Sequence, residues 1–374
     1  MERGLLCADR ITNRSDGIDS LRGFLALWVV FVHTIPWTVA AQGATEATGL
    51  LLWVVKVARV IFQPAYETNP AVLAFIVLSG YCIHRSGLRP GRYDLSRYAA
   101  SRAFRIYPVF VLATCVGVAG FLVALTLDSA MAPKLTGTNG IHWWIVAAKF
   151  VGLSALVPQL HYPSFQGNAP LVTVIAEMWL YAVYPIAIAA LSRMRSERPF
   201  WLALLTIWFV GILCCRTSSV LAGWWHNGSL FGFLLYWWIG AAFVSRILSR
   251  RALVLAAGGW LVTSGALALG LNDLFVVELR KLCFVVLIGA AVSAIDRGHI
   301  KFRIVPPWIG AGGYSLYAFH APVVYCLAIW GSPWWATIAV AMFLGLSAAY
   351  LFELPLTQAG KRAGMRVKPA EAAA

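Results

Sequence analysis

The sequence predicts an all-α membrane protein, a polytopic bundle of about ten transmembrane helices with the N- and C-termini in the cytoplasm. Three observations predict it. Of the 374 residues, 60% are hydrophobic and only 12% are charged, whereas soluble domains are about 25% charged. The mean hydropathy is +0.74, so lipid surrounds most of the surface. Long apolar runs recur along the chain, and basic residues gather in the loops between them.

The apolar runs give ten candidate spans, since a helix needs about 20 mostly apolar residues to cross a bilayer. They are 21–39, 71–83, 103–127, 171–191, 200–215, 230–244, 252–271, 274–295, 308–330 and 335–354. Two further stretches, 49–62 and 141–156, contain basic residues, and we interpret them as interfacial or re-entrant. One membrane domain then covers residues 19–356, between a cytoplasmic segment 1–18 and a cytoplasmic tail 357–374.

The charge distribution supports this topology. Lys and Arg number 30 against 15 Asp and Glu, a net charge of +15. With the N-terminus inside, every Arg-rich loop falls on one side, and 23 of the 30 basic residues lie there. The basic residues form no continuous stripe, which argues against nucleic-acid binding. The seven Cys show no C-x-x-C spacing, so we expect neither disulfides nor a metal site.

Ionisable residues inside the apolar runs are the candidates for function, since a charge at mid-membrane costs at least about 2.5–3.5 kcal/mol. Arg22 and His33 are eleven residues apart, so they share one face of the first span, about 16 Å apart along its axis. This spacing predicts a cation at the cytoplasmic rim and an imidazole near mid-membrane. Taken singly, Arg22 is also typical of a positive-inside anchor, and His33 of a helix-packing contact.

A pair of arginines opens the third span. Arg102 and Arg105 are i, i+3 neighbours and form a fork of two guanidinium groups. Such a fork matches a phosphate group, although it is also typical of a contact with lipid headgroups.

Two other spans carry polar side chains on one face. Glu177 and Tyr181, at i, i+4, place an acid beside a phenol inside the bilayer. A buried Glu is seldom structural. Tyr317 and His320 share a face of the ninth span in the same way.

These motifs occur in a recognisable order. They are Asp19-x-x-Arg22-Gly with His33, Ser79-Gly80-Tyr81, Arg102-x-x-Arg105 with Tyr107-Pro108, Glu177 with Tyr181 and Pro185, Tyr314-Ser-Leu-Tyr317 with His320-x-Pro322, and Glu353-x-Pro355. Together they resemble acyltransferase family 3, the integral-membrane O-acyltransferases. Tyr81 stands where Phe is more usual, and Val172-Thr-Val-Ile-Ala replaces the usual Trp-Ser-Leu before Glu177.

The resemblance implies an acyltransferase that moves an acyl group, usually acetyl from acetyl-CoA, to a hydroxyl of a carbohydrate or other acceptor. Acyl-CoA would be the donor substrate, with no metal. The partners would be the lipid bilayer and a glycan or other hydroxyl-bearing acceptor. The location would be a cell membrane, the inner membrane in a bacterium.

The resemblance also suggests roles. Arg22, Arg102 and Arg105 would hold the phosphates of CoA. His33 would act as general base on the acceptor hydroxyl or become acylated itself, with Glu177 orienting the imidazole as the third member of a triad.

Further polar side chains are candidate contacts to the substrate or to the developing oxyanion. They are Ser79, Tyr81, Tyr181, Tyr317 and His320. For His320, a structural hydrogen bond is an equal alternative.

A function from another class is a proton-coupled transporter of an anionic small molecule. In that alternative, His33, Glu177 and His320 would form a proton relay. The sequence shows no obvious two-half repeat, which argues against it.

Overall fold

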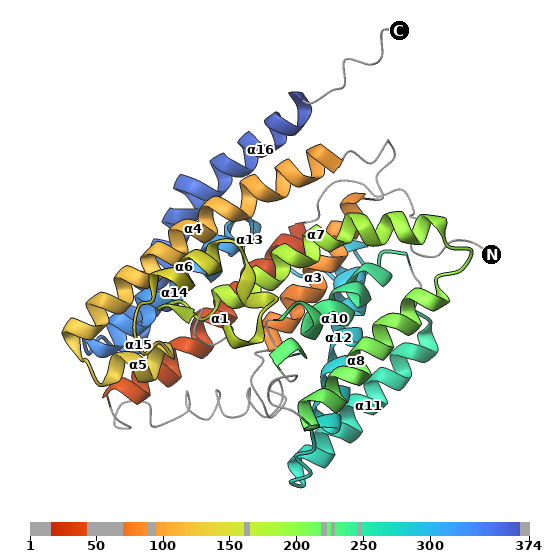
Figure 1. The fold of residues 1–374 in the computed structure, drawn as a ribbon, viewed down its shortest axis with the longest axis horizontal. Helices are drawn as coiled ribbons and strands as arrows, with labels where there is room; N and C mark the ends of the chain where they lie inside the picture. Colours follow the sequence, from red (N-terminus) through yellow and green to blue (C-terminus); the bar gives the residue numbers. More distant parts are fainter. Residues whose placement is uncertain are drawn as a thin grey trace.

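A computed structural model describes residues 16–42, 70–87, 95–160, 165–217, 223–225, 229–245 and 248–366. The described part is helical, with no β-strand (Figure 1). Its main helices are α1 (Asp16–Gln42), α3 (Pro70–Gly87), α4 (Leu95–Leu127), α5 (Met131–Thr136), α6 (Trp143–Phe150), α7 (Leu171–Arg193), α8 (Arg198–Thr217), α10 (Leu230–Ala242), α11 (Arg250–Ala268), α12 (Leu274–Asp296), α13 (Pro307–Ala311), α14 (Gly313–Ile329), α15 (Trp334–Ala348) and α16 (Leu354–Arg366).

Each of the ten predicted ranges is helical over most of its length. Six helical runs are long and apolar enough to cross a bilayer: α1, α4, α7, α8, α11 and the run Trp334–Gly360. Helix α14 is a shorter apolar helix. The protein is therefore a multi-pass membrane protein, while the count of ten spans and the cytoplasmic termini stay predictions.

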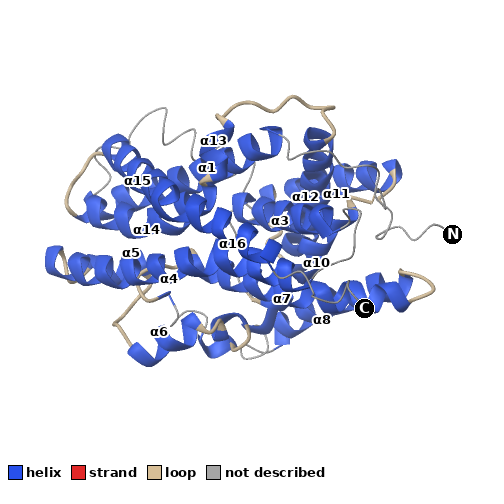
Figure 2. Cartoon of the chain, turned by 90° about the horizontal axis from the view of Figure 1, so that it is seen from above, coloured by secondary structure: helices blue, strands red, loops and turns tan. Residues whose placement is uncertain are grey.

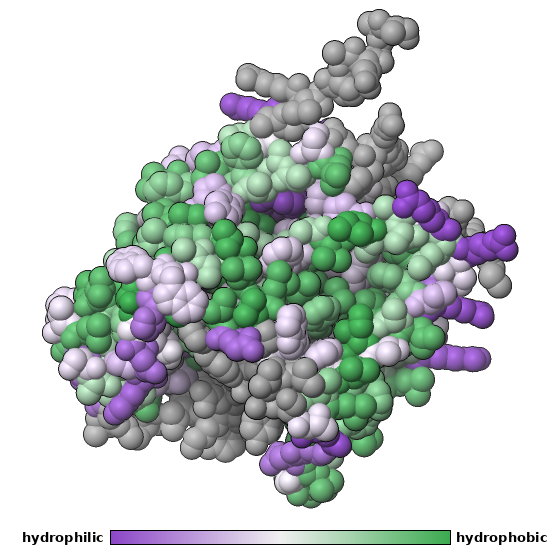
Figure 3. All heavy atoms as spheres, in the orientation of Figure 1, coloured by the Kyte–Doolittle hydropathy of each residue, from purple (hydrophilic) through white to green (hydrophobic). Residues whose placement is uncertain are grey.

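The surface of the bundle fits a lipid environment. Apolar side chains cover much of the face in Figure 3. Leu255, Val262 and Phe343 are among the large apolar residues that stay 70% exposed or more. Such exposure is costly in water and favourable in hydrocarbon.

Two details of the prediction need correction or closer description. The range 308–330 is not one continuous helix, since it divides at Gly312 into α13 and α14. Gly310 of α13 packs directly against α1, because a Cβ there would lie 1.6 Å from the carbonyl oxygen of Asp19. The stretch 141–156 contains the eight-residue α6, too short to span. The stretch 49–62 lies outside the described residues.

The helices form two groups, which Figure 2 shows from above. One group holds α1, α13, α14 and α15, with α4 and α16 packed side by side next to it. The other holds α8, α10, α11 and α12. Helices α3 and α7 lie between the groups and contact members of both. Residues of α1, α3, α4, α7 and α14 can therefore meet at the middle of the bundle.

Helices α3 and α10 touch backbone to backbone. A Cβ on Gly80 would lie 1.9 Å from the Trp237 carbonyl oxygen, and one on Gly240 would lie 2.1 Å from the Val77 carbonyl oxygen. Small residues allow this approach in membrane bundles. The contact fixes the position of Ser79, the neighbour of Gly80, along the axis of α10.

Prolines inside two helices leave backbone carbonyls without their usual donors, and side chains replace those donors. Pro185 frees the Tyr181 carbonyl, to which the Tyr98 hydroxyl donates at 3.0 Å. Pro322 frees the Ala318 carbonyl, to which the Asn168 amide donates at 2.9 Å. Unsatisfied carbonyls are costly in lipid, so these two donors stabilise the helix bends.

The segment that carries Asn168 is itself held by a buried lysine. Lys149 is fully buried and donates to the carbonyls of Phe165 (3.0 Å) and Asn168 (3.3 Å). Burial lowers the pKa of Lys149 to about 7, because desolvation disfavours the charged amine. Asn168 also donates to the Ala113 carbonyl of α4 at 3.1 Å. The segment thus ties α4 to α14.

The contact between α3 and α10 makes a direct prediction. Gly80→Ala forces the two backbones apart and should cost at least about 2 kcal/mol of stability, in the range of overpacked sites. The measurement is thermal unfolding of the purified protein in detergent. Gly258→Ala is the matched control, since nothing lies within 4 Å of a Cβ there. Equal melting temperatures for the two variants would contradict the prediction.

Candidate functional site

A cavity lies among α1, α3, α4, α7 and α14. Its empty volume is about 850 Å³, including the part that opens to solvent. The residues predicted from sequence that line it are Arg22, Ser79, Arg102, Arg105, Glu177, Tyr181 and Tyr317. The structure therefore brings seven of the ten candidates to one place.

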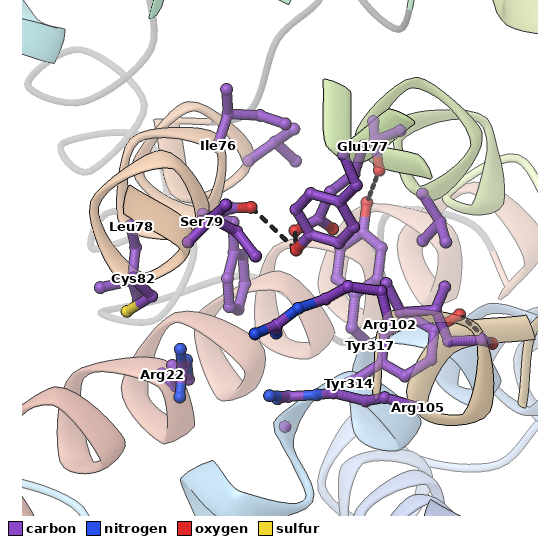
Figure 4. Close-up of a pocket in the computed structure, with 18 of the residues that line it drawn as sticks. Arg22, Ile76, Leu78, Ser79, Cys82, Arg102, Arg105, Glu177, Tyr314 and Tyr317 are labelled. Atoms are coloured by element: carbon purple, nitrogen blue, oxygen red, sulfur yellow. Dashed lines mark hydrogen bonds between the residues drawn. The ribbon is translucent and has the colours of Figure 1, made fainter. Parts of the chain in front are cut away.

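Three guanidinium groups enter this cavity from two helices. Figure 4 shows Arg22 on α1 and Arg102 and Arg105 on α4 reaching into the same space. Arg22 pairs with Asp19 at 3.1 Å, one turn earlier on α1. Arg105 lies 4.0 Å from the Glu353 carboxylate.

The third cation, Arg102, is held without an acid. Its guanidinium lies over the rings of Tyr98 and Tyr181, at 5.8 and 6.0 Å, which favours a cation through the ring quadrupole. Its Nε is buried without a hydrogen-bond partner, and in the described chain no carboxylate pairs with it. A buried donor left unsatisfied is costly, so the cavity is suited to an anionic ligand.

A chain of polar side chains runs along another wall. The Tyr181 hydroxyl donates a short hydrogen bond to Glu177, one turn earlier on α7. It lies 2.9 Å from the Ser79 hydroxyl, to which the Trp237 indole donates at 3.2 Å. The sequence correctly placed Glu177 and Tyr181 together, and the structure adds Ser79 and Trp237.

His33 and His320 do not line the cavity but form a pair with each other. Nδ1 of His33 is 2.8 Å from Nε2 of His320, and Nδ1 of His320 is 2.7 Å from the Tyr317 carbonyl oxygen. Neither imidazole lines the cavity, but Tyr317 does. Tyr317 is thus the link between the cavity and the imidazole pair.

The triad suggested for His33 differs from the structure. The partner of His33 is His320, whereas the partner of Glu177 is Tyr181. Helix periodicity shows which residues share a face of one helix, but it does not show which helix that face meets. The pairing of α1 with α14, 287 residues apart at this bond, could not be read from spacing.

Tyr81 also has a role different from the expected one. It does not line the cavity, and its hydroxyl donates to Asp296 at 2.8 Å. The same carboxylate oxygen lies 2.8 Å from Nε of Arg85. Ser79 and Tyr81 are two residues apart on a helix, so their side chains point about 200° apart and only Ser79 meets the cavity.

The sequence places Glu353 in the Glu353-x-Pro355 motif but predicts no role for it. Glu353 is 1% exposed and accepts a hydrogen bond from the Ser315 backbone N–H at 2.9 Å. It therefore caps the first turn of α14, where a negative charge is favourable. The signal for it is the one that singled out Glu177: an acid within an apolar run.

Comparison with known proteins decides the family. A family model described as an acyltransferase domain, that of acyltransferase family 3, matches residues 15–354. The chain belongs to acyltransferase family 3. No curated protein and no solved structure matches it. The family match covers nearly the whole chain and supports an acyltransferase enzyme, with the cavity and the imidazole pair both inside the matched range.

Substitutions of Tyr181 and Tyr81 distinguish a hydroxyl that lines the cavity from one that lies outside it. Tyr181→Phe removes the hydroxyl that joins Glu177 to Ser79, so the acyl-transfer rate should fall about tenfold, the value of one hydrogen bond to a charged group. Tyr81→Phe removes a hydroxyl that lies outside the cavity, so it should lower the melting temperature and leave the rate within about twofold. Acyl transfer per mole of folded protein measures both, and equal losses would contradict the assignment.

Proposed function

We propose that this family member is a membrane O-acyltransferase that takes an acetyl group from acetyl-CoA and transfers it to a hydroxyl of a carbohydrate or similar acceptor. One observation carries the proposal: three guanidinium groups and Tyr317 line one cavity, and the backbone carbonyl of Tyr317 accepts from His320 of the imidazole pair. Coenzyme A is an anionic ligand with a long neutral arm, and a cavity lined both by arginines and by apolar side chains suits such a ligand.

The arginines would bind the phosphates of the donor. Arg22 reaches the cavity from α1 and the fork of Arg102 and Arg105 from α4, so the three groups can surround a diphosphate from two sides. The basic residues concentrate on the side predicted to be cytoplasmic, where the cell keeps acyl-CoA. The positive charge would also attract the donor electrostatically.

The pantetheine arm would then run inward. Arg22 and His33 are on the same helix, about 16 Å apart along the axis, which a CoA thioester can span. The acyl end would lie at the inner wall, against Tyr317. This leaves the acceptor to approach the imidazole pair from the opposite side of the membrane.

His33 would carry the chemistry. As general base it takes the proton of the acceptor hydroxyl while the oxygen attacks the thioester carbonyl. The C–S bond then breaks, and the CoA thiolate takes the proton back from the imidazole. In the other route open to the same residue, the imidazole attacks first and passes the acyl group on. A burst of thiol release in the absence of acceptor separates the second route from the first.

The other polar groups would support the transfer. The Tyr181 hydroxyl already serves Glu177, and the Tyr317 hydroxyl lies 2.6 Å from Thr173 at the cavity wall. The Tyr317 hydroxyl donates to the Pro170 carbonyl at 3.1 Å. Either phenol could donate to a developing oxyanion only by giving up its present acceptor, Glu177 for Tyr181 and Pro170 for Tyr317. A proton relay of the kind that a transporter needs receives less support, because Glu177 and the imidazoles belong to two separate hydrogen-bonded groups.

A labelling experiment tests the proposal. Membranes that contain equal amounts of wild type, His33→Ala or the double variant Arg102→Gln/Arg105→Gln receive radiolabelled acetyl-CoA. Loss of the base should lower transfer by about 10²–10⁴-fold and leave CoA binding intact. Loss of the fork should weaken CoA binding by at least about tenfold, since each charge-assisted hydrogen bond contributes about 1.5–3 kcal/mol.

Two matched variants control for unspecific effects. Arg216→Gln removes an arginine that pairs with Asp273 outside the cavity, and His299→Ala removes an exposed histidine. Both should transfer acetyl as the wild type does. A His33→Ala protein with full activity, or CoA binding that does not respond to loss of the fork, would overturn the proposal.

A further inference from the structure

The hydrogen bonds of the imidazole pair determine which nitrogen of His33 carries its hydrogen. Nδ1 of His33 on α1 lies 2.8 Å from Nε2 of His320 on α14. The other ring nitrogen of His320, Nδ1, lies 2.7 Å from the Tyr317 carbonyl oxygen. The three groups form a chain of two hydrogen bonds, from the Tyr317 carbonyl through the His320 ring to the His33 ring. The hydrogen atoms in these bonds can be counted.

The count starts from the carbonyl, which can only accept. Nδ1 of His320 must therefore carry the hydrogen in its bond to Tyr317. An uncharged imidazole has one N–H, so Nε2 of His320 is an acceptor. Nδ1 of His33 must then be the donor to His320. By exclusion, the lone pair of His33 lies on its Nε2.

The surroundings favour the uncharged pair. His320 is fully buried, and in the parts of the chain that the structure describes neither imidazole takes part in an ion pair. The ring contacts of His33 are to Trp37 on α1 and to His320. His320 also contacts the ring of Tyr317. A buried charge without a partner is costly, and no described carboxylate pairs with either ring, so the uncharged form of both imidazoles is favoured.

Nε2 of His33 is also the nitrogen that can accept a hydrogen bond from a substrate. Among the described residues it has no hydrogen-bond partner, and His33 as a residue is half-buried. The lone pair that the count assigns to Nε2 is therefore available to a hydroxyl from outside the pair.

We propose that His320 is a positioning residue that fixes the tautomer of His33 and so makes Nε2 of His33 the nitrogen that reacts. The inference rests on the proposed function. In a Ser-His-Asp triad, the carboxylate holds the imidazole in one tautomer. Here the Tyr317 carbonyl and His320 together do the same for His33. In transfer, Nε2 of His33 takes the hydroxyl proton and returns it to the CoA thiolate, so the Nδ1 hydrogen stays in its bond to His320.

Two substitutions divide the roles of the His320 ring. In His320→Asn, the amide can occupy the place of Nδ1 and keep the bond to Tyr317, but no acceptor is left for His33. In His320→Gln, the longer side chain can place an oxygen near Nε2 and accept from His33. We expect His320→Asn to lower kcat about 100-fold, with the KM for acetyl-CoA within about twofold. We expect His320→Gln to recover most of that loss.

The tautomer is measured without the reaction. The 15N NMR spectrum of the histidine-labelled protein in bilayers, with His33 assigned from His33→Ala, should show Nδ1 protonated and Nε2 unprotonated at neutral pH. In His320→Asn the two nitrogens should move towards a mixture of tautomers. His84→Asn is the matched control, since His84 is another buried histidine, 3.1 Å from the Tyr184 hydroxyl and outside the cavity. It should change stability and leave the His33 spectrum unchanged.

The outcomes separate this inference from the proposed function. A hydrogen on Nε2 of His33 in the wild type overturns the inference, as does a His320→Asn protein with the wild-type tautomer and rate. If wild type transfers no acetyl, the proposed function fails, and the spectrum still decides the tautomer. If His320→Asn does not fold, the wild-type spectrum and His320→Gln decide instead.

Discussion

The need to compensate every charge inside lipid shapes this protein more than any other constraint. A charge without a partner is costly inside hydrocarbon, yet three arginines line the cavity between the helices. Asp19 pairs with Arg22, and Glu353 lies 4.0 Å from Arg105. Among the described residues no carboxylate pairs with Arg102, and its guanidinium lies over the faces of two tyrosine rings. The cavity therefore contains a cation without an acidic partner, which suits it to an anionic ligand.

The same constraint explains the supports around the cavity. Proline bends in α7 and α14 free carbonyls that lipid cannot satisfy, and Tyr98 and Asn168 donate to them. Glu353 fulfils two needs, since it caps the start of α14 and lies near Arg105. The polar groups that hold the bends are thus direct neighbours of the groups that line the cavity, which couples the shape of the site to the stability of the bundle.

The sequence predicts what depends on one helix at a time. Apolar runs locate the helices, and i, i+3 or i, i+4 spacing gives the Arg102/Arg105 fork and the bond from Tyr181 to Glu177. It does not predict which faces meet, because that depends on contacts such as Gly310 against Asp19.

Consequently, the partner of His33 is found only in the fold. His320 lies 287 residues further along the chain, and the break at Gly312 that starts α14 has no signal in hydropathy. Tyr81 is the converse case, since its motif position suggested the site while its helix face meets Asp296.

The central claim is that the donor's phosphates occupy the arginine cavity while its acyl group points to the imidazole pair. The most direct measurement is an electron cryo-microscopy structure in lipid nanodiscs with a non-transferable thioether analogue of acetyl-CoA. We expect phosphate oxygens at hydrogen-bond distance, about 2.7–3.2 Å, from Arg102 and Arg105, and the acyl carbonyl beside Tyr317 on the side of His33. A nucleotide bound outside this cavity, or an acyl end that points away from Tyr317, would contradict the claim.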